Sequence, residues 1–167
     1  QNWSLEIVCR DGLCAVLKQI GRYADSIQQQ EYGIALARRI LDPQAEALGL
    51  NNAAVSLMAL GRFPEAERKL IESAEIDRRY PNWPIRAYRI VNSAELHFLM
   101  GSFDQAAVEF AEAADIAVPA DLCALAISCY SGLAMCAQRR HDAEAMRGFC
   151  RMARDFADGR ERLSHDR

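Results

Sequence analysis

The stretch GRFPEAERKLIESA at residues 61–74 returns as GSFDQAAVEFAEAA at residues 101–114, and its start returns as GRYADS at residues 21–26. Glycine begins each copy, and the copies follow one another at a constant 40-residue interval. A fixed interval of this size is typical of one supersecondary unit copied along the chain, because each copy needs its neighbours to bury its apolar face. The sequence therefore predicts an array of helical repeats.

Other positions keep the same interval. An aromatic residue follows each glycine by two positions, and a small residue precedes it by seven. Small side chains let two helix axes approach closely, and the aromatic ring fills the space beside the turn. The interval also reaches a small residue at Ala134, which predicts a fourth copy. In that copy Gln138 to His141 replace the glycine turn, and we expect a loop one residue shorter, with Ala145, Phe149 and Met152 on the apolar face. The aromatic positions are Tyr23, Phe63 and Phe103, and the small positions are Cys14, Ala54 and Ala94.

Apolar residues between the turns recur at intervals of three and four, and strand-like alternation does not persist anywhere in the sequence. The predicted fold is therefore an all-α superhelix of about four helix hairpins, or eight helices. Asp42-Pro43 and the segment from Tyr80 to Pro84 mark helix boundaries, because aspartate caps helices and proline fits a first helical turn.

We expect one domain over residues 1–167, in a fragment of a longer polypeptide. The predicted repeats are residues 3–41, 42–80, 84–118 and 120–157, followed by a polar tail at 158–167. Within them, helix seven is expected at 120–138 and helix eight at 142 to about 157.

Composition and charge limit the kinds of partner and site that the chain can have. The chain is 51% hydrophobic and 26% charged, with a formal net charge of −3, which does not favour a nucleic-acid-binding surface. The sequence holds no apolar run of the length a membrane span needs and no leader pattern, so we expect a cytoplasmic protein without membrane contact. The six cysteines lie inside helical patterns without metal-ligand spacing, which predicts reduced, mostly buried thiols and no metal site.

The sequence contains none of the common catalytic or nucleotide-binding motifs, and we expect neither an enzyme nor a bound cofactor. His97 falls on a predicted helix, where a histidine paired between helices is the simplest interpretation. Arg147, Arg151 and Arg154 form one stripe on the last helix. That stripe is interpreted as an exposed face of a capping helix, with docking to an acidic partner as the alternative.

The segment LGRFPEA at residues 60–66, with small residues at 53 and 54 before it and Leu70 and Ala74 after it, resembles the tetratricopeptide repeat. The resemblance extends over nearly all of residues 3–157. The 40-residue interval departs from the family's usual 34. It is similar to the long-repeat arrays in the sensor regions of bacterial transcriptional regulators of the MalT and LuxR kinds.

The resemblance implies that the first helix of each hairpin lines a concave surface that binds a peptide or partner segment. Asparagines on such a surface offer both donors and acceptors to an extended backbone, while aromatic and methionine side chains form apolar pockets. The alternative is that several of these residues pack against one another. The candidate residues are Lys18, Asn51, Asn52, Val55, Met58, Tyr88, Asn92, Glu95, Phe98, Ser131, Met135 and Arg139.

The sequence is compatible with three functions. The first is a protein- or peptide-binding scaffold within a bacterial signalling or transcription-regulating protein. The second is a small-molecule effector-sensing domain, motivated by the apolar residues Met58, Phe98 and Met135. The third is a homodimerisation module.

Overall fold

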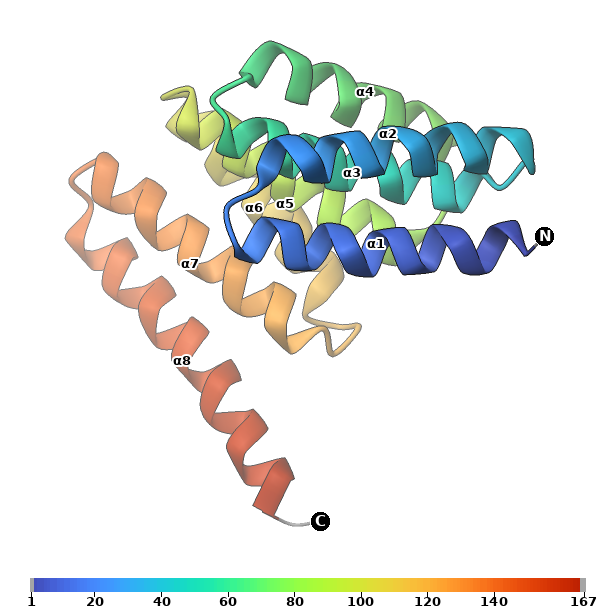
Figure 1. Ribbon diagram of the computed structural model, residues 1–167. Coiled ribbons are helices and arrows are strands. Elements are labelled where there is room, and N and C mark those ends of the chain that lie inside the picture. Colours follow the sequence, from blue (N-terminus) through green and yellow to red (C-terminus); the bar gives the residue numbers. More distant parts are fainter. Residues whose placement is uncertain (1, 166–167) are drawn as a thin grey trace. The chain divides into compact units, whose positions relative to one another are not determined.

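The computed structural model describes the backbone of residues 2–165 and the side chains of residues 2–158 (Figure 1). Over this range the chain forms eight helices and no strand, which confirms the predicted all-α repeat fold. The helices are α1 (Trp3–Gln19), α2 (Tyr23–Arg39), α3 (Pro43–Ala59), α4 (Phe63–Arg79), α5 (Trp83–Leu99), α6 (Phe103–Ala117), α7 (Cys123–Arg139) and α8 (Ala143–His165).

Successive helices begin at evenly spaced positions, from Trp3 at the start of α1 to Ala143 at the start of α8. The three predicted turn aromatics, Tyr23, Phe63 and Phe103, each occupy the first position of an even-numbered helix, and each is half-buried. The 40-residue interval in the sequence is therefore a helix hairpin made of two equal halves.

Six of the turns between helices share one geometry. In each of the six, one residue adopts a positive φ between 54° and 85°. The next amide N–H then donates to the carbonyl five residues earlier, at 2.8 to 3.0 Å, which closes the helix end as a Schellman motif. Glycine serves at three turns, and at the others a larger residue accepts the left-handed conformation at some cost in strain. The six residues are Gly21, Leu41, Gly61, Gly101, Asp121 and His141.

The turn between α4 and α5 is built differently, because Pro81 stands where the positive φ would fall. The proline ring restricts φ to negative values and leaves no N–H to donate, so this turn cannot close in the same way. Instead, Asn82 N–H donates to the carboxylate Oδ1 of Asp77 at 3.1 Å. The second carboxylate oxygen lies 3.3 Å from Nε of Arg86, and the Asp77 side chain is only 5% exposed. A buried side chain thus replaces the backbone carbonyl used at the other turns.

The chain divides into two compact units, residues 1–92 and 93–167, and the boundary falls within α5. The single domain predicted from the sequence stays a prediction.

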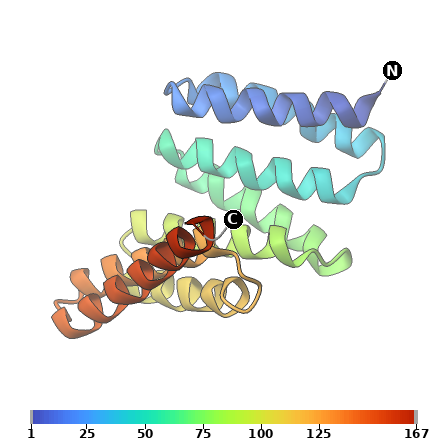
Figure 2. The same cartoon turned by 90° about the horizontal axis from the view of Figure 1, so that it is seen from below.

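In unit 1, the hairpins α1/α2 and α3/α4 form successive layers (Figure 2). The hydroxyls of Ser26 and Ser56, both fully buried, lie 3.1 Å apart between α2 and α3. At Gly49 an added Cβ would lie 2.8 Å from Ile34, so α2 and α3 approach closely there.

Unit 2 packs α6, α7 and α8 in sequence, and α7 and α8 run side by side (Figure 1). The ring of Phe110 is the largest fully buried side chain and lies directly against Gly132 of α7. Tyr130 stacks on Phe156 with ring centres 5.8 Å apart, which ties α7 to α8. Aromatic rings therefore fill the space between these helices.

Three details of the sequence prediction were wrong. Helix α7 begins at Cys123 and not at 120, because Asp121 adopts the left-handed turn conformation that asparagine and aspartate tolerate. The fourth turn is not shortened, since His141 takes the place of glycine there, and Met152 is 41% exposed. The segment predicted as a polar tail remains helical as far as His165, because residues 160–163 contain good helix formers and no proline. Residues 166–167 lie outside the described residues.

We predict that Asp77→Ala lowers the free energy of unfolding by about 1.5–3 kcal/mol, because it removes the buried charged acceptor of the half-buried Asn82 amide in the α4/α5 turn. Urea unfolding monitored by circular dichroism measures this change. The control is Asp104→Ala, which removes a 91% exposed carboxylate 3.5 Å from Arg140 and should change stability by less than about 0.5 kcal/mol. Equal effects of the two substitutions would refute the role assigned to Asp77.

We also predict that Gly132→Ala destabilises unit 2, since the new Cβ would lie 2.5 Å from the Phe110 ring. Overpacking of this kind costs about 1–3 kcal/mol. Gly148→Ala is the matched control, because its Cβ would meet nothing within 4 Å. Removal of a helical glycine there should stabilise the chain by about 0.5–1 kcal/mol. Thermal unfolding should therefore move in opposite directions for the two variants.

Candidate functional site

All twelve residues predicted to bind a partner lie on odd-numbered helices, the first helix of each hairpin. Seven of them belong to unit 1 and five to unit 2. Those in unit 1 are Lys18, Asn51, Asn52, Val55, Met58, Tyr88 and Asn92, and those in unit 2 are Glu95, Phe98, Ser131, Met135 and Arg139.

In unit 1, two of the predicted residues belong to the core. Asn51 is 2% exposed and Met58 is 6% exposed, so neither presents its side chain at the surface. The amide oxygen of Asn51 accepts a hydrogen bond from Nδ2 of Asn92 at 2.9 Å. Asn51 therefore links α3 to α5, as in the packing alternative that the sequence left open.

The accessible residues of the unit 1 group differ in exposure and include both polar and apolar side chains. Lys18, Asn52, Val55 and Asn92 are half-buried, and Tyr88 is exposed over almost half of its surface. The hydrogen bond that Asn92 donates to Asn51 fixes the orientation of the Asn92 amide, whose oxygen keeps its capacity to accept. We call Asn52, Val55, Tyr88 and Asn92 the unit 1 surface. It combines amides able to hold a peptide backbone with one aromatic ring.

In unit 2, Phe98 and Arg139 lie together. The rings of Phe98 and Phe103 pack at 5.2 Å between centres, across the turn between α5 and α6. The guanidinium of Arg139 lies 5.8 Å from the Phe98 ring and 5.7 Å from the Phe103 ring. Both rings are half-buried, whereas Arg139 is exposed. This Phe98/Phe103/Arg139 cluster presents a cation supported by aromatic faces. The contribution of Phe103 was not predicted, because the sequence assigned it only to the turn.

The remaining candidates of unit 2 are exposed: Glu95 on α5, with Ser131 and Met135 on α7. Although the Glu95 carboxyl reaches solvent, the surrounding protein displaces part of its hydration and raises its pKa above the usual range. Burial, reinforced by the nearby Glu95 carboxylate, raises the pKa of the Cys129 thiol to about 12. That thiol stays protonated at neutral pH and cannot serve as a nucleophile.

The other candidate chemical groups are engaged in packing. Nδ1 of His97 lies 2.8 Å from the Glu109 carboxylate, which pairs α5 with α6 as the sequence predicted. No disulfide joins the six cysteines, all of which lie in the described range, and Cys14, Cys129 and Cys136 are buried. Among the described residues, no group of three or more histidine, cysteine, aspartate or glutamate side chains is placed to hold a metal ion. None of the helices in the described range combines the length and the apolar content required to cross a bilayer.

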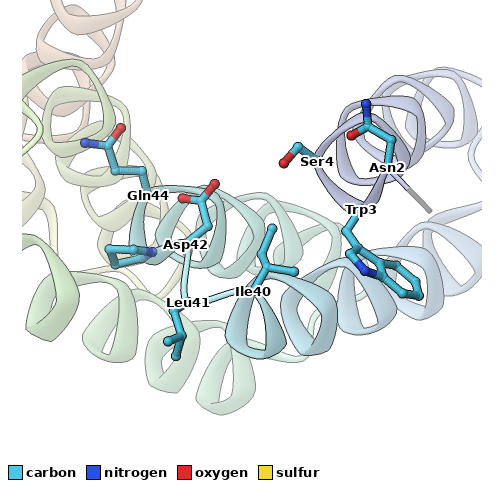
Figure 3. Close-up of a pocket in the computed structure, with 8 residues that line it drawn as sticks. Asn2, Trp3, Ser4, Ile40, Leu41, Asp42 and Gln44 are labelled. Atoms are coloured by element: carbon cyan, nitrogen blue, oxygen red, sulfur yellow. The ribbon is translucent and has the colours of Figure 1, made fainter.

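A depression that the sequence did not indicate lies between the start of α1 and the turn from α2 to α3 (Figure 3). It is open to solvent and encloses about 890 Å³. Its polar groups are largely committed to the fold, since Asn2 and Asp42 accept the capping hydrogen bonds of Leu5 N–H and Ala45 N–H. Leu41, whose positive φ makes the turn, is 86% exposed on its wall. The lining residues are Asn2, Trp3, Ser4, Ile40, Leu41, Asp42, Pro43 and Gln44.

The repeated hairpins, the Schellman turns and the absence of strands in the described range define an α–α repeat protein. Residues 45–117 match the tetratricopeptide repeat family, so the predicted resemblance is confirmed for this central segment. The crystal structure of BtubC (BKLC) from P. vanneervenii is similar to this chain, with a TM-score of 0.76 at 18% sequence identity. The similarity covers 96% of this chain but only 66% of BtubC, just under two thirds of its length. At this identity the likeness shows a shared fold. No curated protein matches the sequence.

The raised pKa of Glu95 predicts a pH-dependent contribution to stability. The folded state holds the proton more tightly than the unfolded state, so the contribution is fully present below the unfolded pKa of about 4.3. It is lost as the pH rises through the raised folded pKa. The stability of Glu95→Gln relative to the original chain should therefore increase from pH 4 to pH 7, as measured by urea unfolding across this range. A constant difference between the two proteins would contradict the environment described for Glu95.

Proposed function

We propose that this chain is a protein- or peptide-binding scaffold that recognises its partner through the accessible side chains of its odd-numbered helices. Tetratricopeptide repeats generally mediate protein–protein interactions, and residues 45–117 match that family. Stacked repeats of this kind use one face of the array as a preformed binding surface. Partner binding, and not catalysis, is therefore the activity we assign to the chain.

The hydrogen bond from Asn92 to Asn51 is the observation that carries the proposal. Burial of an amide side chain is costly unless its hydrogen bonds are made, yet Asn51 is 2% exposed and accepts from a surface residue. The bond orients the Asn92 amide before any partner arrives, which lowers the entropy cost of binding. Tyr88, one helical turn earlier on α5, adds an exposed ring beside it. This arrangement suits an extended peptide backbone with one apolar side chain.

The Phe98/Phe103/Arg139 cluster supports the same function in unit 2. A guanidinium held over aromatic rings can pair with a carboxylate of a partner while the ring edges contact apolar side chains. The pKa of the exposed Glu95 carboxyl is raised by desolvation, and a partner cation would lower it again. We infer that Arg139 and Glu95 together favour a segment carrying both signs of charge.

For the setting of this scaffold, we propose a cytoplasmic bacterial signalling or transcription-regulating protein. The support is the 40-residue interval, which resembles the long-repeat sensor regions of MalT- and LuxR-type regulators. Nucleic-acid binding by the chain itself is not favoured by its net charge of −3. The effector-sensing alternative has less support, because Met58, one of its three apolar lining residues, lies in the core of unit 1.

Selection of a phage-displayed random peptide library against the chain tests the proposal. We predict that enriched peptides bind the chain directly in calorimetry and that Tyr88→Ala weakens binding about tenfold or more, the loss expected of an interface anchor. Tyr32→Ala is the matched control, because Tyr32 is 49% exposed, against 47% for Tyr88, but lies on the even-numbered helix α2. It should leave the affinity within about twofold.

Failure to enrich any peptide, or equal losses for both tyrosine variants, would overturn the proposal. Asn92→Ala provides a further comparison within the unit 1 surface. Its circular dichroism spectrum must match that of the original chain, since the substitution also removes the partner of the buried Asn51.

A further inference from the structure

Asp11 on α1 carries a half-buried carboxyl whose charge is not compensated within unit 1. No basic side chain of the described residues forms an ion pair with it. Burial raises the pKa of Asp11 above its usual range. The charge of Lys18, about two helical turns further along α1, lowers this pKa only in part. Asp11 is therefore a carboxyl that a cation from outside the chain can stabilise.

The repeat shows what this position does elsewhere in unit 1. The 40-residue interval places Asp11 on α1 where Asn51 stands on α3, and Asn52 on α3 where Asn92 stands on α5. Between α3 and α5, Asn92 donates to Asn51 at 2.9 Å. Helix α1 also packs against α3, yet within the described residues no hydrogen bond joins Asp11 to Asn52. The protein closes the first junction itself and leaves the second to another partner.

The side chain of Gln30 on α2 supports this interpretation. It is 2% exposed, and its Nε2 has no hydrogen-bond acceptor. The Gln30 amide faces the Asp11 carboxyl and lowers its pKa, but the two groups do not reach the geometry of a full hydrogen bond. A buried donor left unsatisfied is costly. A cation at Asp11 would keep the carboxylate ionised, and an ionised carboxylate is the stronger acceptor for this amide.

The chemistry of this position favours a cationic side chain. A positive charge in contact with a partly desolvated carboxylate offsets the cost of its burial, whereas an anion would be repelled. An apolar group would remove the remaining hydration and offer no hydrogen bond in return. On the basis of the peptide-binding function proposed above, we propose that Asp11 binds a lysine or arginine side chain of the peptide held by the unit 1 surface.

Helix packing sets the distance between this cation and the peptide side chain that contacts Tyr88. Helix α3 packs against α1 and is bonded to α5 through Asn51, so α1 and α5 lie on either side of it. Packed helix axes are about 8–10 Å apart, which separates α1 from α5 by roughly 16–20 Å. An extended peptide advances about 3.3 Å per residue. The cation should therefore stand about five or six positions from the residue that contacts Tyr88.

Selection of the phage-displayed library against the original chain and against Asp11→Asn tests this specificity. Peptides enriched by the original chain should carry lysine or arginine about five or six positions from an apolar residue. Asp11→Asn should lose this preference. The matched control is Asp25→Asn, which changes the net charge equally but alters a 44% exposed carboxylate on the even-numbered helix α2, paired with Arg22 at 2.6 Å. It should enrich the same cationic peptides as the original chain.

Calorimetry with one enriched peptide then tests the contact itself. The peptide is synthesised with an acetylated N-terminus, so that its terminal amine cannot supply the cation, and a second version carries norleucine in place of the basic residue. Norleucine should weaken binding to the original chain about tenfold or more, the loss expected for a charge-assisted hydrogen bond. With Asp11→Asn the two peptides should differ by less than about twofold. Circular dichroism must show both protein variants folded.

Enriched peptides that lack a cation at this spacing contradict the proposed role of Asp11. Equal losses from norleucine in the original chain and in Asp11→Asn contradict it as well, and so does an Asp25→Asn variant that loses the preference for cationic peptides. In each of these cases, binding that depends on Tyr88 still supports the scaffold function. Failure to enrich any peptide would instead overturn both proposals, so the two kinds of failure are distinguishable.

Discussion

The fold depends on one backbone constraint, the left-handed residue that closes the helix end at six of the turns. This residue turns the chain back towards the next helix, and the amide that follows it satisfies a carbonyl of the preceding helix. The helices begin at regular intervals, and equivalent residues fall at equivalent places. The array tolerates Leu41, Asp121 and His141 in this conformation, which costs side chains with a Cβ about 1–2 kcal/mol each. The uniform geometry is therefore maintained at a cost in local strain.

Sequence reasoning found the hairpins because glycine is conspicuous where a positive φ is needed, as at Gly61. It placed the start of α7 too early and predicted a fourth turn one residue too short. Asp121 and His141 adopt the positive φ at these two turns, and neither residue type marks that conformation as glycine does. The candidate residues lie on the first helix of each hairpin, as the sequence placed them, yet periodicity alone could not separate the buried Asn51 from the half-buried Asn52. That distinction depends on which helix lies opposite, through contacts such as Asn51 with Asn92. The pairing of Arg139 with Phe98 and Phe103 is equally non-local.

Polar groups in this protein are used mainly for positioning. Asp77 closes a turn that proline prevents from closing by itself, and Asn51 orients an amide at the surface. His97 and Glu109 join two helices. Such groups are costly to bury and are retained where they specify one arrangement over others.

The equal spacing of the helices has a kinetic consequence. Almost all of the packing described within each unit joins a helix to its immediate neighbour in the chain, so contacts form without the closure of long loops. Chains with such local topology fold rapidly, and their hairpins can unravel one at a time from an end while the rest stay folded. A terminal hairpin can therefore open and reclose without global denaturation.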